Sequence, residues 1–201
     1  MTDSGKLFEG DDPIGIARRW LEEAALSEPS YPEAVALSTV DESGMPNTRI
    51  VLLKAIEDDG FVFFTNYSSD KGREIAASGK ASINCYWKSL GRQIRVRGTI
   101  EKVSDAASDA YYVSRPLGSR IGAWASQQSM PLESRQALLN AVKNAEDEYG
   151  EDPPRPPHWG GYKIVPRDIE FWADGEFRLH DRFRWSRDEN ADSWSNQRLF
   201  P

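Results

Sequence analysis

The sequence predicts one α+β domain in which six or more mainly antiparallel strands form a barrel with helices at its periphery. Two observations predict this class. Short runs rich in β-branched and aromatic residues follow one another across turns of only a few residues, which suits antiparallel hairpins rather than βαβ units. The helix-like segments carry capping residues at their starts. The 201 residues show no internal repeat and no low-complexity tail.

Composition and charge exclude several function classes. The chain is 39% hydrophobic and 28% charged, with a net charge of −7, and this acidic balance disfavours nucleic-acid binding. No apolar run approaches the ~20 residues that span a bilayer, and the N-terminus lacks the apolar segment of a signal peptide. We therefore expect a cytoplasmic protein without a membrane partner. One cysteine and two histidines cannot form an ordinary zinc cluster, so no metal site is expected. Cys85 is expected to be a small buried hydrophobe.

The first half of the chain predicts a helix and then a meander. Residues 1–11 are expected to form a flexible N-terminal arm and residues 12–201 the domain. Asp12 followed by Pro13 marks the start of a helix, which should run to about Ala25. The strands expected next, joined by short turns, are Val35–Val40, Thr48–Ile56 and Phe61–Thr65.

The second half predicts further helices between hairpins. Ser69–Ser78 is typical of a short helix that ends at Gly79. Another helix should begin after Ser104 and end before Pro116, which cannot continue it. Pro131–Tyr149 is expected to be the longest helix. The remaining strands are expected at Ala81–Trp87, Arg92–Val103, Tyr162–Val165, Ile169–Trp172, Phe177–Arg187 and Trp194–Leu199.

The stretch Ile169–Trp185 is the most unusual. Ala173–Glu176, read as Ala-Asp-Gly-Glu, predicts a tight hairpin turn. Alternate residues of the second arm share one face, which would line up four basic side chains: Arg178, His180, Arg182 and Arg184. Such a row repels itself unless an anion compensates it. It indicates either a solvated edge strand protected from aggregation or a strand that binds an anionic, planar ligand, because guanidinium groups pair with oxyanions and stack on rings.

Two other segments place cations beside strands. In Arg49-Ile-Val-Leu-Leu-Lys54, alternation puts Arg49 and Lys54 on opposite faces, where they could bind two different anions or simply reach solvent. The segment Phe63–Gly72 runs from a strand into a helix that carries Lys71 in its first turn. Backbone N–H groups, hydroxyls and a lysine at a helix N-terminus suit a phosphate. An ordinary capped loop is equally consistent with this segment.

Polar side chains also gather after residue 110. Tyr111 and Arg115 share one helix face, and Ser119 follows the helix break. The three could form a phosphate cup or pack as an ordinary amphipathic helix. Gln128 and Ser129, in a loop expected at 122–129, could bind a ligand or neighbouring backbone. No P-loop, nucleophile elbow or carboxylate dyad is evident, so any chemistry is expected to belong to a borrowed cofactor.

Taken together, these motifs resemble the pyridoxine/pyridoxamine 5′-phosphate oxidase family, from about residue 12 to the C-terminus. The matching segments are Arg49-Ile-Val-Leu-Leu-Lys54, Phe63-Phe-Thr-Asn-Tyr67 with Lys71-Gly72, Arg92-Gln-Ile-Arg95, Ser114-Arg-Pro116 with Ser119, Ile121-Gly-Ala-Trp-Ala-Ser126 with Gln128-Ser129, His158-Trp-Gly-Gly-Tyr162, Ile169-Glu-Phe-Trp172 with Arg178-Leu-His-Asp-Arg182, and Arg198-Leu-Phe-Pro201.

The resemblance implies a split β-barrel that works as a homodimer with FMN at the subunit interface. It implies oxidation of pyridoxine or pyridoxamine 5′-phosphate to pyridoxal 5′-phosphate, with hydride passing from C4′ to flavin N5 and reoxidation by O2 that yields H2O2. It assigns FMN binding to Arg49, Ile50, Val51, Leu52, Phe64, Thr65, Lys71, Gln93, Gln128, Ser129, Trp172 and Arg182. It assigns the substrate phosphate to Lys54, Tyr111, Arg115 and Ser119, and the substrate ring and catalysis to Arg178 and His180.

The sequence departs from the family pattern in two functional places. Asp70 stands where many members carry an arginine that helps to bind the FMN phosphate, so FMN affinity is expected to be weaker. The N-terminal arm has no Arg or Tyr before Arg18, so the family's lid over the substrate is expected to be missing. Two rival functions stay open: a split-barrel flavoprotein with another substrate, such as a flavin reductase, and a flavin or pyridoxal phosphate carrier without turnover.

Overall fold

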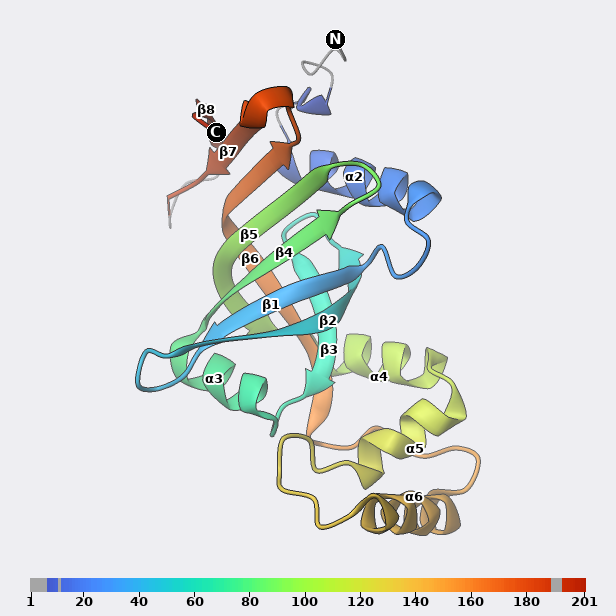
Figure 1. The fold of residues 1–201 in the computed structure, drawn as a ribbon. Helices are drawn as coiled ribbons and strands as arrows, with labels where there is room; N and C mark the ends of the chain where they lie inside the picture. Colours follow the sequence, from blue (N-terminus) through green and yellow to red (C-terminus); the bar gives the residue numbers. More distant parts are fainter. Residues whose placement is uncertain (1–6, 11, 189–192) are drawn as a thin grey trace.

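The structure is a computed structural model that describes residues 7–10, 12–188 and 193–201. Its eight strands form one antiparallel sheet in the order β3-β2-β1-β4-β5-β6-β7-β8, and β3 also pairs with β6. That extra pairing closes six strands into a barrel, while β7 and β8 extend the sheet beyond it (Figure 1). The predicted split-barrel α+β class is confirmed. The strands are β1 Ala34–Val40, β2 Pro46–Ile56, β3 Phe61–Asn66, β4 Lys80–Trp87, β5 Arg92–Lys102, β6 Trp159–Ala173, β7 Asp181–Ser186 and β8 Ser195–Leu199.

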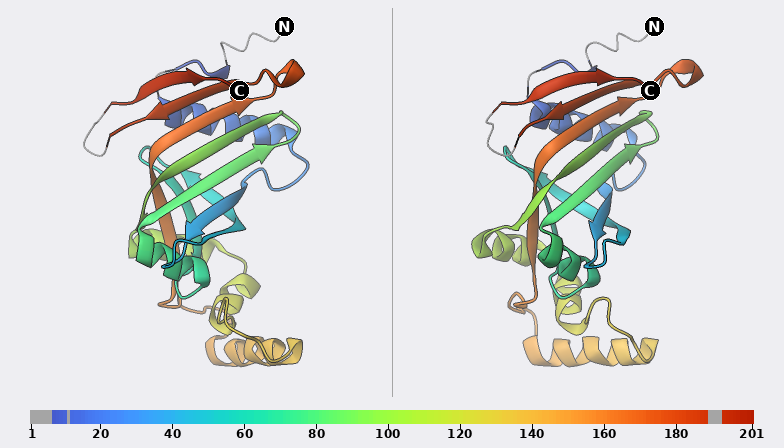
Figure 2. Two further views of the ribbon diagram at one scale, coloured as in Figure 1. Left: turned by 60° about the vertical axis from the view of Figure 1, so that its left-hand side comes forward. Right: turned by 90° about the vertical axis from the view of Figure 1, so that its left-hand side faces the viewer.

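Helices cover the two ends of the barrel in the described part of the chain. Helix α2 lies beside the β4–β5 hairpin at one end, whereas α4, α5 and α6 lie together at the opposite end, with α6 outermost (Figures 1 and 2). The helices are α2 Pro13–Ser27, α3 Asp70–Ser78, α4 Asp105–Ser114, α5 Leu117–Ala125 and α6 Arg135–Tyr149. None of these helices is long and apolar enough to cross a membrane.

Capping residues begin and end the helices as the sequence predicts. Asp12 accepts hydrogen bonds from the backbone N–H groups of Ile14 and Gly15, so α2 starts at Pro13. Ser69 caps α3, and Gly79 ends it with a φ of 63°, a left-handed conformation that glycine adopts without steric cost. Two helix predictions are wrong. The expected loop at 122–129 is helical up to Ala125, and α6 begins at Arg135 rather than Pro131.

The two strands expected at 162–165 and 169–172 are one continuous strand, β6. Its pairing with β5 steps from Arg97↔Asp168 to Gly98↔Pro166, which leaves one extra residue on β6. Proline is tolerated at such a bulge because the ladder is already interrupted there. A Cβ on Gly98 would lie 2.0 Å from the carbonyl oxygen of Val165, so the close approach of the strands requires glycine.

The predicted tight turn at 173–176 is also wrong. Ala173 pairs with Asp181, so the turn holds residues 174–180 and includes a short 3₁₀ helix, η1 Glu176–Arg178. Arg178 and His180 therefore lie in the turn and not on the strand with Arg182. The sequence pattern missed this because Phe177 and Arg178 adopt φ values of 56° and 65°, which non-glycine residues rarely adopt.

The hydrophobic core fills the barrel and the space beneath α2. Trp20, Phe171 and Trp185 are among its largest fully buried side chains, and Trp20 and Trp185 each contact Phe171 edge to face. The expected flexible arm falls largely on residues outside the described ranges. In its described part, Phe8 is buried between Trp20 and Phe183, whereas Glu9 and Gly10 are exposed. Cys85 is buried as predicted.

Candidate active site

A buried lysine marks the N-terminus of α3. Lys71 is only 8% exposed, and its Nζ donates to Ser69 Oγ at 3.2 Å and to Gln128 Oε1 at 3.1 Å. Both acceptors are neutral. Burial and the nearby charge of Arg49 lower the pKa of Lys71 from its ordinary value of 10.5. An ammonium group next to a guanidinium at a helix N-terminus is suited to an oxyanion.

Arg49 approaches the same helix from strand β2. Its Nη2 lies 2.9 Å from Glu74 Oε2, and its Nη1 donates to Thr39. The second oxygen of Glu74 accepts from Asn47 Nδ2 at 2.9 Å. Burial by itself raises the pKa of Glu74, but the hydrogen bonds from Thr39, Asn47 and Arg49 outweigh burial and lower it below 4.5. Glu74 is thus an ionised carboxylate that fixes the position of Arg49.

The loop after α5 completes this cluster. Thr65 Oγ1 donates to Gln128 Oε1 at 3.4 Å, and Ser129 Oγ accepts from the backbone N–H of Asp70 at 3.1 Å. Ser129 has a φ of 72°, which turns the loop back onto α3. The structure therefore brings together five of the predicted FMN-binding residues, which we call the α3 cluster: Arg49, Thr65, Lys71, Gln128 and Ser129. The carboxylate of Asp70 pairs with Arg73 instead of extending this cluster.

A pocket of about 370 Å³ adjoins the α3 cluster. Its lining includes Phe64, Thr65 and Gln128 together with Arg115, Ser119 and Trp159. Arg115 Nη1 is buried and has no hydrogen-bond partner among the residues that the structure describes. Burial also lowers the pKa of Arg115. A half-buried guanidinium with an unpaired N–H group is costly unless a ligand compensates it, so this pocket suits an anion.

Tyr111 stands behind that pocket. Its ring stacks on Phe64 at 4.0 Å, and Phe64 lines the pocket together with Arg115 and Ser119. Lys54, the fourth residue assigned to the substrate phosphate, is not among the residues that line the pocket. Its Nζ lies 3.7 Å from Glu33 Oε1. Of the neighbouring β2 residues, Ile50 and Leu52 are exposed and Val51 is half-buried.

The other predicted site residues gather around the end of β6, in a group that we call the β6-end group: Gln93, Trp172, Arg178, His180 and Arg182. Trp172 pairs with Gln93 on β5 and with Arg182 on β7. The rings of Trp172 and His180 lie 4.6 Å apart. His180 Nδ1 lies 3.0 Å from Asp174 Oδ1. Arg178 is exposed on the turn, beside the strongly exposed Phe177 and Leu179.

Within one chain, the α3 cluster lies near the start of β6 and the β6-end group lies near its end. Trp159 is the first residue of β6 and lines the pocket, whereas Trp172 is next to the last residue of that strand. At 3.2–3.4 Å per residue, this separation along β6 is about 40 Å. Figure 1 shows the β6–β7 turn far from α4 and α5. One chain therefore does not bring the predicted site residues together.

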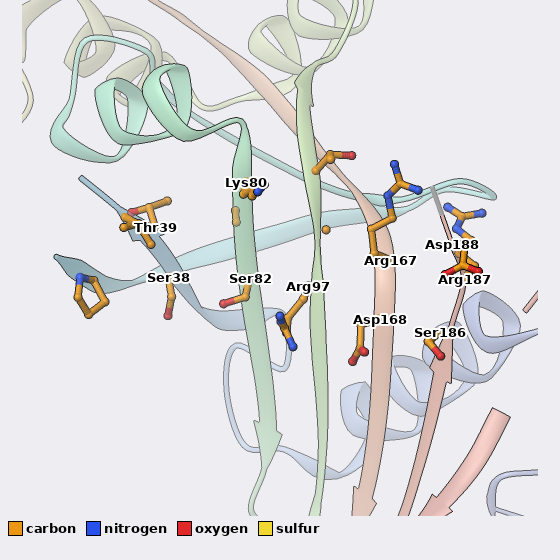
Figure 3. Close-up of a pocket in the computed structure, with 15 residues that line it drawn as sticks. Ser38, Thr39, Lys80, Ser82, Arg97, Arg167, Asp168, Ser186, Arg187 and Asp188 are labelled. Atoms are coloured by element: carbon orange, nitrogen blue, oxygen red, sulfur yellow. The ribbon is translucent and has the colours of Figure 1, made fainter. Parts of the chain in front are cut away.

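Another concavity, of about 800 Å³, lies elsewhere. It is an open groove across the sheet, where Ser82, Arg97 and Asp168 lie on neighbouring strands (Figure 3). None of the predicted site residues lines it. Within the described ranges no three or more His, Cys, Asp and Glu side chains form a group that could hold a metal ion.

Sequence reasoning missed three residues of the site. Trp159 lies within the matched segment His158-Trp-Gly-Gly-Tyr162, which could have served as a signal. Glu170, the partner of Arg182, lies within another matched segment, Ile169-Glu-Phe-Trp172. Glu74 left no local signal, because its partner Arg49 is distant in sequence.

Comparison with known proteins shows the family of this chain. A family model described as pyridoxamine 5′-phosphate oxidase matches residues 21–148, and one described as a pyridoxine 5′-phosphate oxidase C-terminal dimerisation region matches residues 159–201. Proteins named pyridoxine/pyridoxamine 5′-phosphate oxidase are similar along the chain. The one from Cereibacter sphaeroides is 57% identical over 99% of this chain and 100% of that protein, and the one from Paracoccus denitrificans is 59% identical over 93% and 87%.

A solved structure is also similar. PhzG from Burkholderia lata, in complex with tetrahydrophenazine-1-carboxylic acid, superposes with a TM-score of 0.90 at 34% identity and covers 96% of this chain and 95% of its own. An FMN-binding protein from Nostoc punctiforme shares the fold, with a TM-score of 0.74 at 20% identity over 97% and 100%. The family models, the relatives and the fold agree, and this chain belongs to the pyridoxamine 5′-phosphate oxidase family.

Proposed function

We propose that this protein is an FMN-dependent oxidase that converts pyridoxine 5′-phosphate or pyridoxamine 5′-phosphate to pyridoxal 5′-phosphate. The names of its relatives support this reaction. The observation that carries the proposal is the unpaired, buried Nη1 of Arg115 in a pocket adjoining the α3 cluster. Two neighbouring sites suited to anions are what a phosphorylated cofactor and a phosphorylated substrate need.

The residues of the α3 cluster fit the phosphate of FMN. Lys71 has only neutral acceptors, and burial lowers its pKa. A bound anion would favour the protonated ammonium form and so offset the cost of burying it. Arg49 supplies a second cation beside the same helix N-terminus. We assign the FMN phosphate to these two side chains, with Thr65, Gln128 and Ser129 as hydrogen-bond partners.

The pocket beside the α3 cluster fits the substrate phosphate. Arg115 would pair its free N–H group with a phosphate oxygen, and Ser119 would add a hydroxyl donor. Tyr111, whose ring is stacked on Phe64, has a phenol that can contribute a third contact. Lys54 is assigned to the same phosphate, although its present partner is Glu33, so substrate would have to compete for it.

We assign the remaining residues of each site to a second chain. Since the α3 cluster and the β6-end group of one chain lie at opposite ends of β6, we propose a homodimer in which each active site uses the α3 cluster of one protomer and the β6-end group of its partner. The match of residues 159–201 to a dimerisation region supports this arrangement. The exposed Phe177 and Leu179 beside Arg178 would then lie in the interface.

The protein would contribute mainly by holding the flavin ring and the pyridine ring of the substrate in contact. When bound, FMN supplies the acceptor for hydride from substrate C4′ and passes the electrons to O2, which yields H2O2. Arg178 and His180 would hold the substrate ring in place, and the guanidinium of Arg178 would stabilise negative charge at the substrate oxygen. Replacement of Arg178 by alanine should therefore lower kcat/KM far more than FMN affinity.

The test is an anaerobic titration. The protein is loaded with FMN, pyridoxine 5′-phosphate is added, and the visible flavin spectrum is followed. Bleaching that reverses when air is admitted is the expected result, with pyridoxal 5′-phosphate and H2O2 as products. A stable oxidised spectrum with FMN demonstrably bound would contradict the proposal and favour a carrier.

A second candidate is oxidation of another anionic ring compound. The observation that favours it is the likeness to PhzG, which is described in complex with tetrahydrophenazine-1-carboxylic acid. The same anaerobic titration separates the two reactions: flavin bleaching by a reduced heterocyclic carboxylate, and none by pyridoxine 5′-phosphate, would support the second candidate.

A further inference from the structure

Trp159 occupies a central place in the pocket. Its indole is 6% exposed and lies nearly parallel to two other rings: Phe64, at 5.6 Å and 15°, and Tyr111, at 6.1 Å and 11°. The Cζ atom of Arg115 lies over the same indole at 4.6 Å. Trp159 thus contacts one residue assigned to the cofactor and two assigned to the substrate phosphate.

The backbone of Trp159 is tied to the helix that carries Tyr111. The carbonyl of Trp159 accepts from Arg155 Nη1 at 2.8 Å. The same guanidinium donates through Nη2 to Asp105 at 2.8 Å and through Nε to Asp109, both on α4. Arg155 therefore connects the start of β6 to α4. This connection holds the indole of Trp159 at a fixed distance from Tyr111, which follows Asp109 on α4.

An indole suits Arg115 better than a carboxylate would. A guanidinium is attracted to the face of an aromatic ring by the ring quadrupole, and that attraction orients its plane without using its N–H groups. A carboxylate would orient Arg115 equally well but would occupy those N–H groups and compete with a phosphate. The ring leaves Nη1 unpaired, as the structure shows.

We propose that Trp159 is a positioning residue for substrate binding: its ring holds the guanidinium of Arg115 in the plane from which Nη1 meets the substrate phosphate. This inference rests on the proposed function, in that it takes the substrate to carry a phosphate at Arg115. It predicts that Trp159 acts only on phosphorylated ligands and only through Arg115.

The test measures binding rather than turnover. The FMN-loaded protein is titrated by calorimetry with 4-deoxypyridoxine 5′-phosphate, which has no oxidisable group at C4′, and with 4-deoxypyridoxine, which lacks the phosphate. Trp159→Leu should lower the affinity for the phosphorylated ligand about tenfold, and Trp159→Phe, which keeps a smaller ring, should lower it roughly threefold. Affinity for 4-deoxypyridoxine and for FMN should change by less than about twofold, since neither depends on Arg115.

A double-mutant cycle with Arg115→Ala shows whether Trp159 acts through Arg115. In the Arg115→Ala background, Trp159→Leu and Trp159→Phe should cause no further loss. If either substitution lowers affinity for the phosphorylated ligand as much in the Arg115→Ala background as in the wild-type background, Trp159 acts independently of Arg115 and the inference is wrong. Should the leucine variant fail to fold, the phenylalanine variant supplies the same comparison.

Two further variants separate this inference from the proposed function. Trp124 is the matched control: its ring stacks on Tyr149 at 4.4 Å and does not line the pocket, so Trp124→Phe should leave affinity unchanged. Arg115→Ala by itself should lower the preference for the phosphorylated ligand by roughly 10- to 100-fold, because Lys54, Tyr111 and Ser119 remain to hold the phosphate. If the preference for the phosphorylated ligand is unchanged in Arg115→Ala, the substrate-phosphate assignment fails and the role of Trp159 fails with it. If that preference falls, the double-mutant cycle of Trp159 and Arg115 decides the inference.

Discussion

The carboxylate of Glu170 accepts two hydrogen bonds from the guanidinium of Arg182, at 3.0 Å from Nε and 2.8 Å from Nη2. Glu170 lies on β6 and is buried, and Arg182 reaches it diagonally from β7, where it is paired with Trp172. The third donor of the guanidinium, Nη1, is used by the backbone carbonyl of Phe200 at 2.8 Å. The pair therefore joins β6, β7 and the C-terminal residues, and it orients a side chain that we assign to FMN.

Removal of Glu170 should destabilise the protein. In Glu170→Ala the guanidinium of Arg182 would lose its charged acceptor in a largely buried place, at a cost of about 2 kcal/mol in the free energy of unfolding. Urea unfolding of the FMN-free protein at fixed protein concentration measures this change. The control is Asp58→Ala, because the ion pair of Asp58 with Arg18 is exposed to solvent and such surface pairs contribute less than about 1 kcal/mol. Equal losses in the two variants would contradict the prediction.

Lys71→Met should separate cofactor affinity from stability. A charge-assisted hydrogen bond to a phosphate contributes about 1.5–3 kcal/mol, so FMN affinity should fall by roughly 10- to 100-fold. The FMN-free protein should be as stable as wild type or more stable, because the variant no longer buries an ammonium group among neutral acceptors. Flavin fluorescence titration and urea unfolding measure the two effects.

Lys88→Met is the control for that substitution, since Lys88 is exposed in the β4–β5 turn. It should change neither quantity. Wild-type FMN affinity in Lys71→Met would remove Lys71 from the phosphate site.

Cys85 should make the protein less stable at alkaline pH. Burial raises the pKa of its thiol to about 12, from an ordinary value of 9.0. Between these values the unfolded chain has lost the proton and the folded chain retains it, so stability falls as pH rises, by up to about 1.4 kcal/mol per pH unit. The difference in unfolding free energy between wild type and Cys85→Val, measured from pH 8 to 10.5, isolates this effect from that of the tyrosines. Parallel pH profiles would show that Cys85 does not titrate as its burial requires.

Mixed dimers should test whether the site is shared between protomers. Arg115→Ala and Arg178→Ala should each be nearly inactive as homodimers. If one active site takes Arg115 from one chain and Arg178 from the other, a heterodimer of the two variants has one intact site. Co-refolding equal amounts should then recover about one quarter of wild-type activity, since half of the dimers are mixed and each has one of two sites. No recovery, with mixed dimers shown to be present, would place both residues in one chain's site.

Sequence patterns predicted the local features correctly for physical reasons. The caps at Asp12 and Ser104 depend only on residues two or three positions away. Where a distant contact decides, the patterns were wrong. The strand through Pro166 continues because β5 pairs with it across a bulge, and the turn at 174–180 depends on positive φ values that no residue type there indicates.

The amino-acid sequence by itself determined the barrel class, the starts of α2 and α4, the family and the cationic residues suited to phosphates, because these depend on short-range periodicity and on motifs. Only the tertiary structure decided which of them meet. It brought Gln128 to Lys71, 57 positions away, placed Trp159 beneath Arg115, and set Arg178 at the far end of β6. Such contacts depend on how the strands close and which side chains pack between them, and packing acts between residues that no local pattern connects.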